Sequence, residues 1–279
     1  MLPALVAGLA ACSAIKLGYN NLDEIAYWWL DSYVDFTDDQ APRAREDLAR
    51  LHWWHRNEDL PRLMRMLQDM EQLATRDITP AQACTFVTEF RRHLRTVADR
   101  AEPAAVTLAT ALGPEQLLHL QHKYQKNNAK YDDEWLAVPP AEQREKRFKQ
   151  FQERAEMIYG RLDEPQREAL RRDIDQTIFD PRRILAERKR RQQDSLQMLR
   201  QVAGGQVGLG DARKLVRGYL DRVQVPPVKE YRDYQETLIQ EGCRHFAVLH
   251  NSTSPAQREA AVLRLRAYQR DLRELAAPQ

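Results

Sequence analysis

The stretch GPEQLLHLQHKYQKNNAKYDDEW, residues 113–135, decides the fold class because one apolar stripe follows it at helical spacing. The stripe is formed by Leu117, Leu120, Tyr124, Tyr131 and Trp135. Steps of three and four residues place these side chains on one face of an α-helix over about five turns. The intervening Gln, Lys, Asn and Asp residues form a polar face. The stretch therefore predicts an amphipathic helix that begins near Pro114.

Similar stripes recur along the chain. They comprise Phe86, Phe90, Leu94 and Val97; Phe148, Phe151, Ala155 and Ile158; and Leu265, Tyr268, Leu272 and Leu275. Glycine is scarce, with ten residues, and alternating runs rich in Val, Ile and Thr are absent. The sequence predicts an all-α array of about a dozen amphipathic helices without a sheet.

The expected helix boundaries carry a common motif. Thr79-Pro80-Ala81-Gln82 shows it: a cap, a proline in the first turn, and a glutamine that can bond back to the cap. The same pattern occurs at 113–116, 163–166 and 254–257, and without proline at 37–40. Breaks are expected near Asp77–Pro80, Glu102–Pro103, Gly113–Pro114, Val138–Pro140, Gly160–Pro165, Asp180–Pro181, Gly204–Gly210, Pro226–Pro227 and Ser252–Pro255.

The N-terminus ends a short apolar segment with Leu9-Ala10-Ala11-Cys12, which resembles a bacterial lipobox. The resemblance implies cleavage before Cys12 and a lipid on that cysteine. We therefore expect a signal-peptide remnant at 1–11, a lipid-anchored tether at 12–20 and a helical domain at 21–279, with two lobes possibly joined at 204–210. No basic residue precedes Lys16, so an apolar terminus with a chance cysteine remains the alternative.

The expected location follows from this anchor. The first segment is too short to span a bilayer, so the lipid on Cys12 would be the membrane attachment. Ser13 and Ala14 do not provide the Asp that retains lipoproteins in the inner membrane, which favours the outer membrane, facing the periplasm. A formal charge of +2 gives no general attraction to nucleic acid. The expected partners are the membrane and an unknown envelope protein or unfolded client.

Two family resemblances support an envelope location. The first is to a family of uncharacterised Gram-negative lipoproteins; it implies a helical envelope protein and no particular activity. The matching segments are Cys12-Ser13, Leu17–Leu22, Trp28–Asp31, Tyr33, Gln40, Trp54–Arg56, Leu60-Pro61, Leu112–Gln116, Arg190–Gln193 and His250–Thr253. They cover nearly the whole chain after Cys12.

The second resemblance is local. Phe36-Thr37-x-x-Gln40, Ile78-Thr79-x-x-Gln82 and Leu112-Gly113-x-x-Gln116 are similar to the Leu-Thr-x-x-Gln motif of the small periplasmic Spy and CpxP proteins. This likeness implies a holdase chaperone or an envelope-stress protein, which is the alternative function. Helix capping alone also accounts for the motif.

Two surfaces are candidates for partner binding. One contains the tryptophans Trp28, Trp29, Trp53 and Trp54. A helix-packing core is the favoured interpretation of this cluster, with Trp28 or Trp53 at its rim. The other contains Arg182, Arg183, Lys189 and Arg190, which fall within an arc of about 120° on one helix. This arc could meet lipid headgroups or an acidic partner, although a solvated helix face is the simpler interpretation.

The cysteines could form a disulfide and the histidines could bind a metal ion, and neither group matches a catalytic motif. With Cys12 assigned to lipid, Cys84 and Cys243 can form a disulfide in an oxidising compartment; two buried thiols are the alternative. His52 and His55, like His119 and His122, are spaced to share a zinc ion, but local sequence supplies no third ligand. No nucleophile elbow or dinucleotide loop is present. We expect a non-enzymatic binding or structural protein without cofactor or metal.

Overall fold

The computed structural model describes residues 16–205 and 207–277, and within them the chain is helical throughout. Eleven α-helices are joined by short connections, and no strand occurs in the described residues. The predicted all-α class is confirmed. Cys12 and the predicted signal-peptide remnant lie outside the described residues. No helix in the described part of the chain is both long and apolar enough to cross a membrane.

The helices take their order directly from the chain. They are α2 (Leu22–Val34), α3 (Gln40–Trp54), α4 (Leu60–Ala74), α5 (Pro80–Thr110), α6 (Pro114–Trp135), α7 (Pro140–Tyr159), α8 (Glu164–Asp175), α9 (Pro181–Val202), α10 (Leu209–Gln224), α11 (Lys229–Asn251) and α12 (Pro255–Ala276). A π-helical turn, η1 (His55–Asp59), separates α3 from α4, and a 3₁₀ turn, η2 (Ala203–Gly205), follows α9.

The capping motif forms in full at three of the five helix starts where it was predicted. At 37–40 only the bond from Thr37 N–H to Gln40 Oε1 forms, at 3.2 Å, and α3 begins at Gln40. Thr79, Asp163 and Ser254 each accept a hydrogen bond from the backbone N–H of the glutamine three residues later, and that glutamine side chain bonds back to the cap. Gly113 has no side chain, so only half of the motif forms there, through Gln116 Oε1 at 2.9 Å from Gly113 N. Local chemistry therefore determines where these helices begin.

Two pairs of these glutamines also link helices across the molecule. The Gln166 and Gln257 amides exchange hydrogen bonds of 2.8 and 2.9 Å between the starts of α8 and α12. Gln40 and Gln116 do the same between α3 and α6. Each glutamine amide donates in addition to a backbone carbonyl near its partner helix. These four glutamines therefore have a structural role, since each one joins two helices.

One expected boundary is wrong. α5 continues through Pro103, although a proline inside a helix loses one backbone hydrogen bond and costs about 3 kcal/mol. Tertiary contacts on both sides of the proline hold the helix together. Glu102 bonds to Arg213 and Arg217 of α10, and Val106 packs in an apolar cluster with Val216. Packing on α10 therefore outweighs the local preference for a break.

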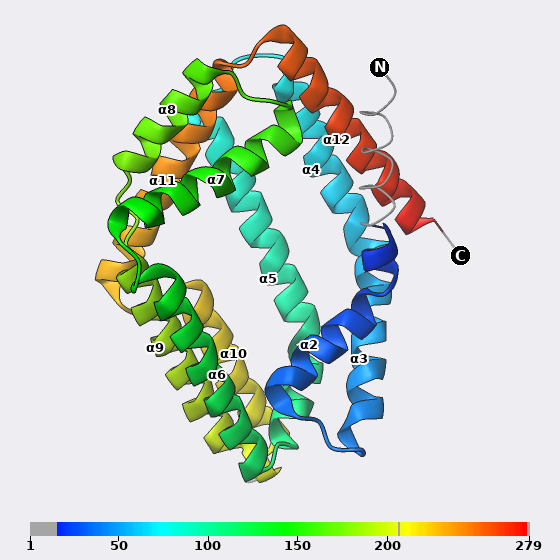
Figure 1. Ribbon diagram of the computed structural model, residues 1–279. Coiled ribbons are helices and arrows are strands. Elements are labelled where there is room, and N and C mark those ends of the chain that lie inside the picture. The colour runs from blue at the N-terminus through cyan, green and yellow to red at the C-terminus, as the bar shows by residue number, and fades with distance from the viewer. Residues whose placement is uncertain (1–15, 206, 278–279) are drawn as a thin grey trace.

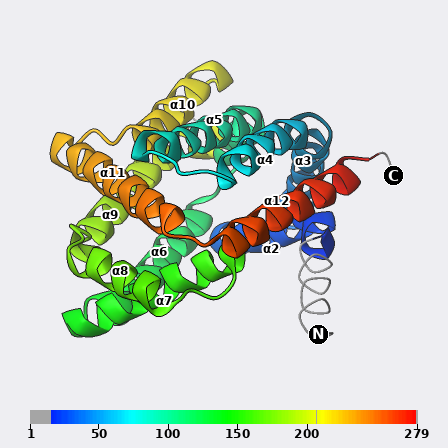
Figure 2. The same cartoon turned by 90° about the horizontal axis from the view of Figure 1, so that it is seen from above.

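The packed helices form a closed ring (Figure 1). Successive contacts run α3–α2–α6–α9–α10–α5–α11–α8–α7–α12–α4, and η1 returns the chain of contacts from α4 to α3. Seen from above, α10, α5, α4 and α3 lie along one side and α8, α7, α6 and α2 along the other (Figure 2). Apolar clusters hold this ring at separate places, with α5–α9–α10 and α4–α7–α12 as two of them.

Two segments differ from simple expectations. Residues 16–20, predicted as tether, are helical, and Lys16 pairs with Asp271 of α12 at 3.1 Å. The glycine-rich connection follows α9, with Gly204 at φ 67°, a left-handed conformation that glycine adopts freely. Because α9 and α10 pack on each other in one apolar cluster, this connection reverses the chain within the ring. The division into two lobes stays a prediction.

Candidate functional site

Three side chains with metal-binding chemistry converge where α3, η1 and α5 meet. His55 and Asp59 stand at the two ends of η1, and His93 projects from α5. His55 Nε2 lies 3.5 Å and His93 Nδ1 lies 3.1 Å from Asp59 Oδ2. One ligand atom from each residue lies within 4.8 Å of the others. In the described part of the chain this is the one group of three or more such residues that could hold a metal ion.

The Asp59 carboxylate is fully buried and yet unsatisfied. Its exposed fraction is 0%, and neither oxygen takes part in a hydrogen bond with a described residue. The two imidazole nitrogens are near Oδ2, but their N–H directions do not form hydrogen bonds with it. Burying a charge without such partners is costly. The Asp59 carboxylate would therefore be stabilised by a bound cation or by a proton.

The backbone of η1 is as unusual as its side chains. Leu60 N–H donates to the carbonyl of His55, the five-residue spacing of a π-helix. Single π-helical turns inside α-helices are rare and occur frequently at functional sites. Here the turn places His55 and Asp59 side by side, facing α5.

A tyrosine orients the first histidine. Tyr19 Oη lies 2.7 Å from His55 Nδ1, which leaves Nε2 for Asp59. Burial raises the pKa of Tyr19 to about 12, so the hydroxyl stays protonated. Burial also lowers the pKa of His55, more than the neighbouring Asp59 raises it. His55 is therefore neutral at pH 7, and in the tautomer that donates from Nδ1 its Nε2 lone pair faces Asp59.

A cavity of about 350 Å³ between α4 and α5 reaches this cluster. Its lining comprises Asp59, Arg62, Leu63, Arg65, Met66, Asp69, Glu89, Arg92, His93 and Thr96. Asp59 and His93 thus have one side toward a space that can admit water or a small ion. The remaining lining includes three arginines, Arg62, Arg65 and Arg92, and two carboxylates, Asp69 and Glu89, so the cavity is polar and holds both signs of charge.

A second tyrosine–histidine pair lies elsewhere in the ring. Tyr159 Oη is 2.9 Å from His250 Nδ1, and His250 Nε2 is 2.8 Å from the carbonyl oxygen of Arg76. Burial raises the pKa of Tyr159 to about 12 and lowers the pKa of His250. Both nitrogens of His250 therefore have partners, and this pair is a completed structural contact.

A larger and mostly apolar cavity, of about 520 Å³, lies between α7, α8 and α11. Phe151, Ile158, Ile174, Phe246 and Leu249 are among its lining residues. The Arg147 guanidinium stands in the same wall, 4.0 Å from the centre of the Phe179 ring and 3.3 Å from Thr177 Oγ1. Burial lowers the pKa of Arg147, more than the nearby Glu241 carboxylate raises it. Asp173 and Glu241 also line this cavity.

The tryptophan cluster is mostly at the surface. Trp28 and Trp29 of α2 and Trp53 of α3 are 61%, 59% and 62% exposed, whereas Trp54 is 5% exposed. Trp28 and Trp53 lie at the surface, as expected for the rim of the cluster, and Trp54 is in the core; the interpretation as a core is wrong for Trp29. Tyr27 takes the inward position on α2, where its ring stacks on Phe36. The role of the tryptophans in partner binding stays a prediction.

The four residues of the predicted basic arc differ in their surroundings, because one of them is held in ion pairs and three are exposed. Arg190 bonds to the buried Glu187 and to Asp194 on its own helix, and it donates to the carbonyl of Arg222 on α10 at 3.3 Å. Arg182, Arg183 and Lys189 are exposed on α9. Arg183 also lies over the Tyr234 ring at 5.0 Å. A partner-binding surface here would depend on three of the four predicted residues.

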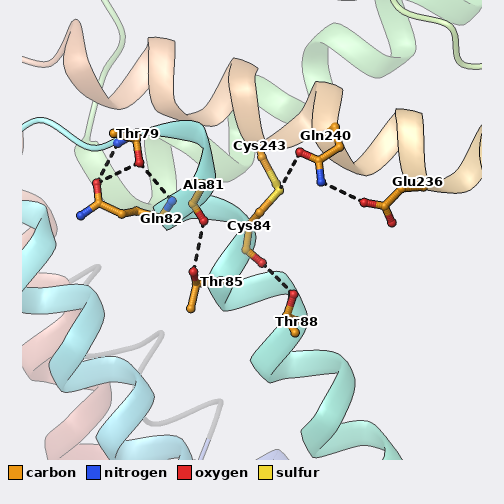
Figure 3. The surroundings of a disulfide bond; sticks show 9 residues. All are labelled: Thr79, Ala81, Gln82, Cys84, Thr85, Thr88, Glu236, Gln240 and Cys243. Carbon is orange, nitrogen blue, oxygen red and sulfur yellow. Dashed lines mark hydrogen bonds between the residues drawn. A yellow bond between two sulfur atoms is a disulfide. The ribbon is translucent and has the colours of Figure 1, made fainter.

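The two cysteines after Cys12 are joined in the structure. Cys84 of α5 and Cys243 of α11 form a disulfide with a Cα–Cα distance of 5.4 Å (Figure 3). Ile78, Ala83 and Ala247 surround it in an apolar cluster. Because 159 residues separate the cysteines, this bond ties distant parts of the chain. Cys84 lies on the same helix as His93, nine residues or about 13 Å closer to the start of α5.

The histidine spacings anticipated part of this site. His55 belongs to the cluster, and its predicted companion His52 lies beside it, with its ring 5.0 Å from that of Tyr19. The third ligand, His93, comes from α5 and has no local signal in the sequence. Asp59 follows His55 by four residues, a spacing that a search for carboxylates beside histidines could have found. The His119–His122 pair gains no third ligand among the described residues.

The comparisons with known proteins give a family and no activity. Searches among curated proteins and among solved structures find no match to this chain. One family model, described as a family of unknown function (DUF6279), matches residues 32–212, which is more than half of the 279 residues. The matched range contains His55, Asp59 and His93. The chain therefore belongs to the family of unknown function DUF6279.

Proposed function

We propose that this protein is a lipid-anchored component of the bacterial cell envelope whose helical ring binds an amphipathic anion. In this proposal Cys12 carries the lipid, the membrane is the outer one, and the role is binding rather than catalysis. The cavity between α7, α8 and α11 is the observation that carries the proposal. A mostly apolar cavity of several hundred Å³ with a few placed polar groups is the usual form of a small-molecule site.

The charge inside this cavity indicates the ligand class. Arg147 shares the cavity wall with Arg154 and with the carboxylates of Asp173 and Glu241, and its hydrogen bond goes to Thr177 Oγ1 and not to either carboxylate. A guanidinium in such a position is stabilised by an anionic group, above all one that accepts two hydrogen bonds. A fatty acid supplies both the carboxylate for Arg147 and a hydrocarbon chain for Phe151 and Phe246.

The envelope location is supported by two features. Leu9-Ala10-Ala11-Cys12 resembles a lipobox. The Cys84–Cys243 disulfide suits an oxidising compartment, because cytosolic thiols are kept reduced. Replacing Cys12 by Ala should release the protein from the membrane fraction. Mass spectrometry that finds an unmodified Cys12 in membrane-bound wild type would contradict the anchor.

The ligand proposal is tested with a fluorescent apolar probe, N-phenylnaphthylamine, displaced by a long-chain fatty acid. Gly242 lines the cavity, and no atom outside its chain neighbours and the adjoining backbone of its own helix lies within 4 Å of the position that a Cβ would take there. Gly242→Phe should therefore fill the cavity without displacing the helix and abolish probe binding. Gly210→Phe, on a helix start with equally open surroundings, is the matched control.

A second variant separates the charge from the apolar contact. Arg147→Gln should weaken displacement by the fatty acid about tenfold or more and leave displacement by the corresponding fatty alcohol nearly unchanged. Unaltered probe binding in Gly242→Phe would show that the cavity is not the binding site. Equal losses for acid and alcohol in Arg147→Gln would refute the anionic ligand.

The exposed tryptophans favour holdase activity as the second candidate. A holdase must offer apolar surface to an unfolded client, and Trp28, Trp29 and Trp53 provide such a surface near the N-terminus. The chain should then suppress aggregation of an unrelated unfolding protein without ATP. Trp53→Ser should reduce this suppression while helix content stays unchanged, with Trp135→Phe as the control. No suppression at several-fold molar excess would end this proposal.

A further inference from the structure

We infer that His55, Asp59 and His93 bind one divalent transition-metal ion, with zinc as the best-fitting ion. In tetrahedral zinc sites the bonds to His and carboxylate ligands are about 2.0–2.1 Å, which places neighbouring ligand atoms about 3.3–3.4 Å apart. The observed distances to Asp59 Oδ2, 3.5 Å from His55 Nε2 and 3.1 Å from His93 Nδ1, bracket that separation.

The donor set selects the class of metal. Two imidazoles and one carboxylate suit zinc and its neighbours in the first transition row, whereas Mg²⁺ and Ca²⁺ prefer oxygen ligands throughout. Three protein ligands leave a fourth position, and the cavity between α4 and α5 supplies the space for it. Sites of this kind keep a water or a small anion on the metal.

The metal also accounts for the buried carboxylate. Asp59 has an exposed fraction of 0% and no hydrogen bond to either oxygen from the described residues. A cation coordinated by Oδ2 removes the cost of burying this charge. The same ion explains why two nitrogens approach Oδ2 within 3.5 Å without directing an N–H at it.

The surroundings of His55 match those of a metal ligand. Histidine ligands usually use one ring nitrogen for the metal and donate the other to an oxygen acceptor. Tyr19 Oη, 2.7 Å from His55 Nδ1, is that acceptor here. The tyrosine comes from the helical segment before α2, so it fixes the imidazole from outside the helix that carries it.

The test is zinc binding by the mature chain, first stripped with EDTA and then dialysed against Zn²⁺. We expect one zinc per chain by elemental analysis, and Co²⁺ in its place should give the intense visible absorption of four-coordinate cobalt. His93→Gln should weaken zinc binding more than tenfold. His119→Gln, which removes a partly exposed histidine next to the Ser32 carbonyl, is the matched control and should bind like wild type.

A second variant, which changes the fold less, tests zinc binding without replacing a ligand. Tyr19→Phe keeps the ring and removes the oxygen that orients His55, so it should weaken zinc binding by about tenfold, within the range for such outer partners. Circular dichroism verifies the fold of each variant. Wild-type protein that binds no zinc, or His93→Gln that binds as tightly as wild type, would overturn the inference. In that event, a shared proton would balance Asp59.

Discussion

The protein has two tyrosine–histidine pairs, one half-buried and one buried, that agree at one imidazole nitrogen and differ at the other. Tyr19–His55 and Tyr159–His250 both have the phenol oxygen within 3 Å of Nδ1. His250 Nε2 then meets the backbone carbonyl of Arg76, whereas His55 Nε2 faces the buried Asp59 without a hydrogen bond. The same residue pair thus completes a structural contact in one place and leaves a coordination position in the other.

The two pairs should therefore contribute differently to the stability of the protein. A satisfied buried imidazole contributes hydrogen bonds and holds two segments together, here α11 and the end of α4. An imidazole that lies next to a carboxylate without a hydrogen bond to it contributes little to the free energy of unfolding, because the carboxylate remains unsatisfied. Regions that bind ligands are often less stable than the rest of a protein, because their polar groups lack partners until the ligand is bound.

The largest expected effect breaks the completed pair. His250→Leu leaves the Tyr159 hydroxyl and the Arg76 carbonyl without their partners in a buried site, so we expect a loss of about 3 kcal/mol in the free energy of unfolding. His55→Gln in metal-free protein should cost about 1 kcal/mol, because less is satisfied to begin with. Urea denaturation of both variants measures the contrast. Equal losses would mean that the two pairs are equivalent.

A smaller effect concerns the carboxylate itself. Asp59→Asn should raise the free energy of unfolding of the metal-free protein by about 1 kcal/mol, because it removes a buried charge that has no bonded partner. Glu102→Gln is the matched control. Glu102 is also buried, but it bonds to Arg213 and Arg217, so its neutral variant should lose stability.

Zinc gives this prediction an independent check. A zinc concentration one hundred times the dissociation constant should stabilise wild type by about 2.7 kcal/mol and leave Asp59→Asn nearly unaffected. If Asp59→Asn destabilises the metal-free chain as much as Glu102→Gln does, then Asp59 is a satisfied structural group. The comparison of the two pairs would then lose its basis.

The sequence predicts what is local in this fold. Helix class follows from apolar stripes, and most helix starts follow from caps such as Thr79 and Ser254, because these bonds join residues three positions apart. The continuation of α5 through Pro103 depends on Arg213 and Arg217, more than 100 residues away, and could not be read locally. The exposure of Trp29 could not be predicted locally either, since it depends on which helices cover α2.

The candidate site shows the same limit. The spacing of His52 and His55 allows a shared ion, but the expectation from the sequence is no metal site, and His52 is not part of the cluster. The other histidine of the cluster, His93, joins only through the packing of α3 on α5. The π-helical turn between Trp54 and Leu60 has no sequence signal that we recognised. A spacing rule therefore identifies half of such a site, and the topology supplies the rest.

The last prediction concerns the pH dependence of stability. Burial lowers the folded-state pKa of both His55 and His250 below the ordinary value of 6.5. Between these lowered values and about pH 6.5, unfolded imidazoles bind protons that the folded ones do not. The free energy of unfolding of metal-free protein should therefore fall as the pH falls through this window, by at most about 1.4 kcal/mol per pH unit for each histidine.

His55→Gln sharpens this prediction, because it should remove part of the slope between pH 6.5 and 5.5 and leave the share of His250 intact. Added zinc should steepen the slope of wild type, since protons compete with the metal for His55 and His93. His55→Gln should show no such steepening. Urea denaturation at pH 7.5, 6.5 and 5.5, with EDTA and with zinc, measures both terms. A slope that His55→Gln leaves unchanged in EDTA would show that His55 is not held neutral by burial, and the contrast between the two imidazoles would rest on geometry alone.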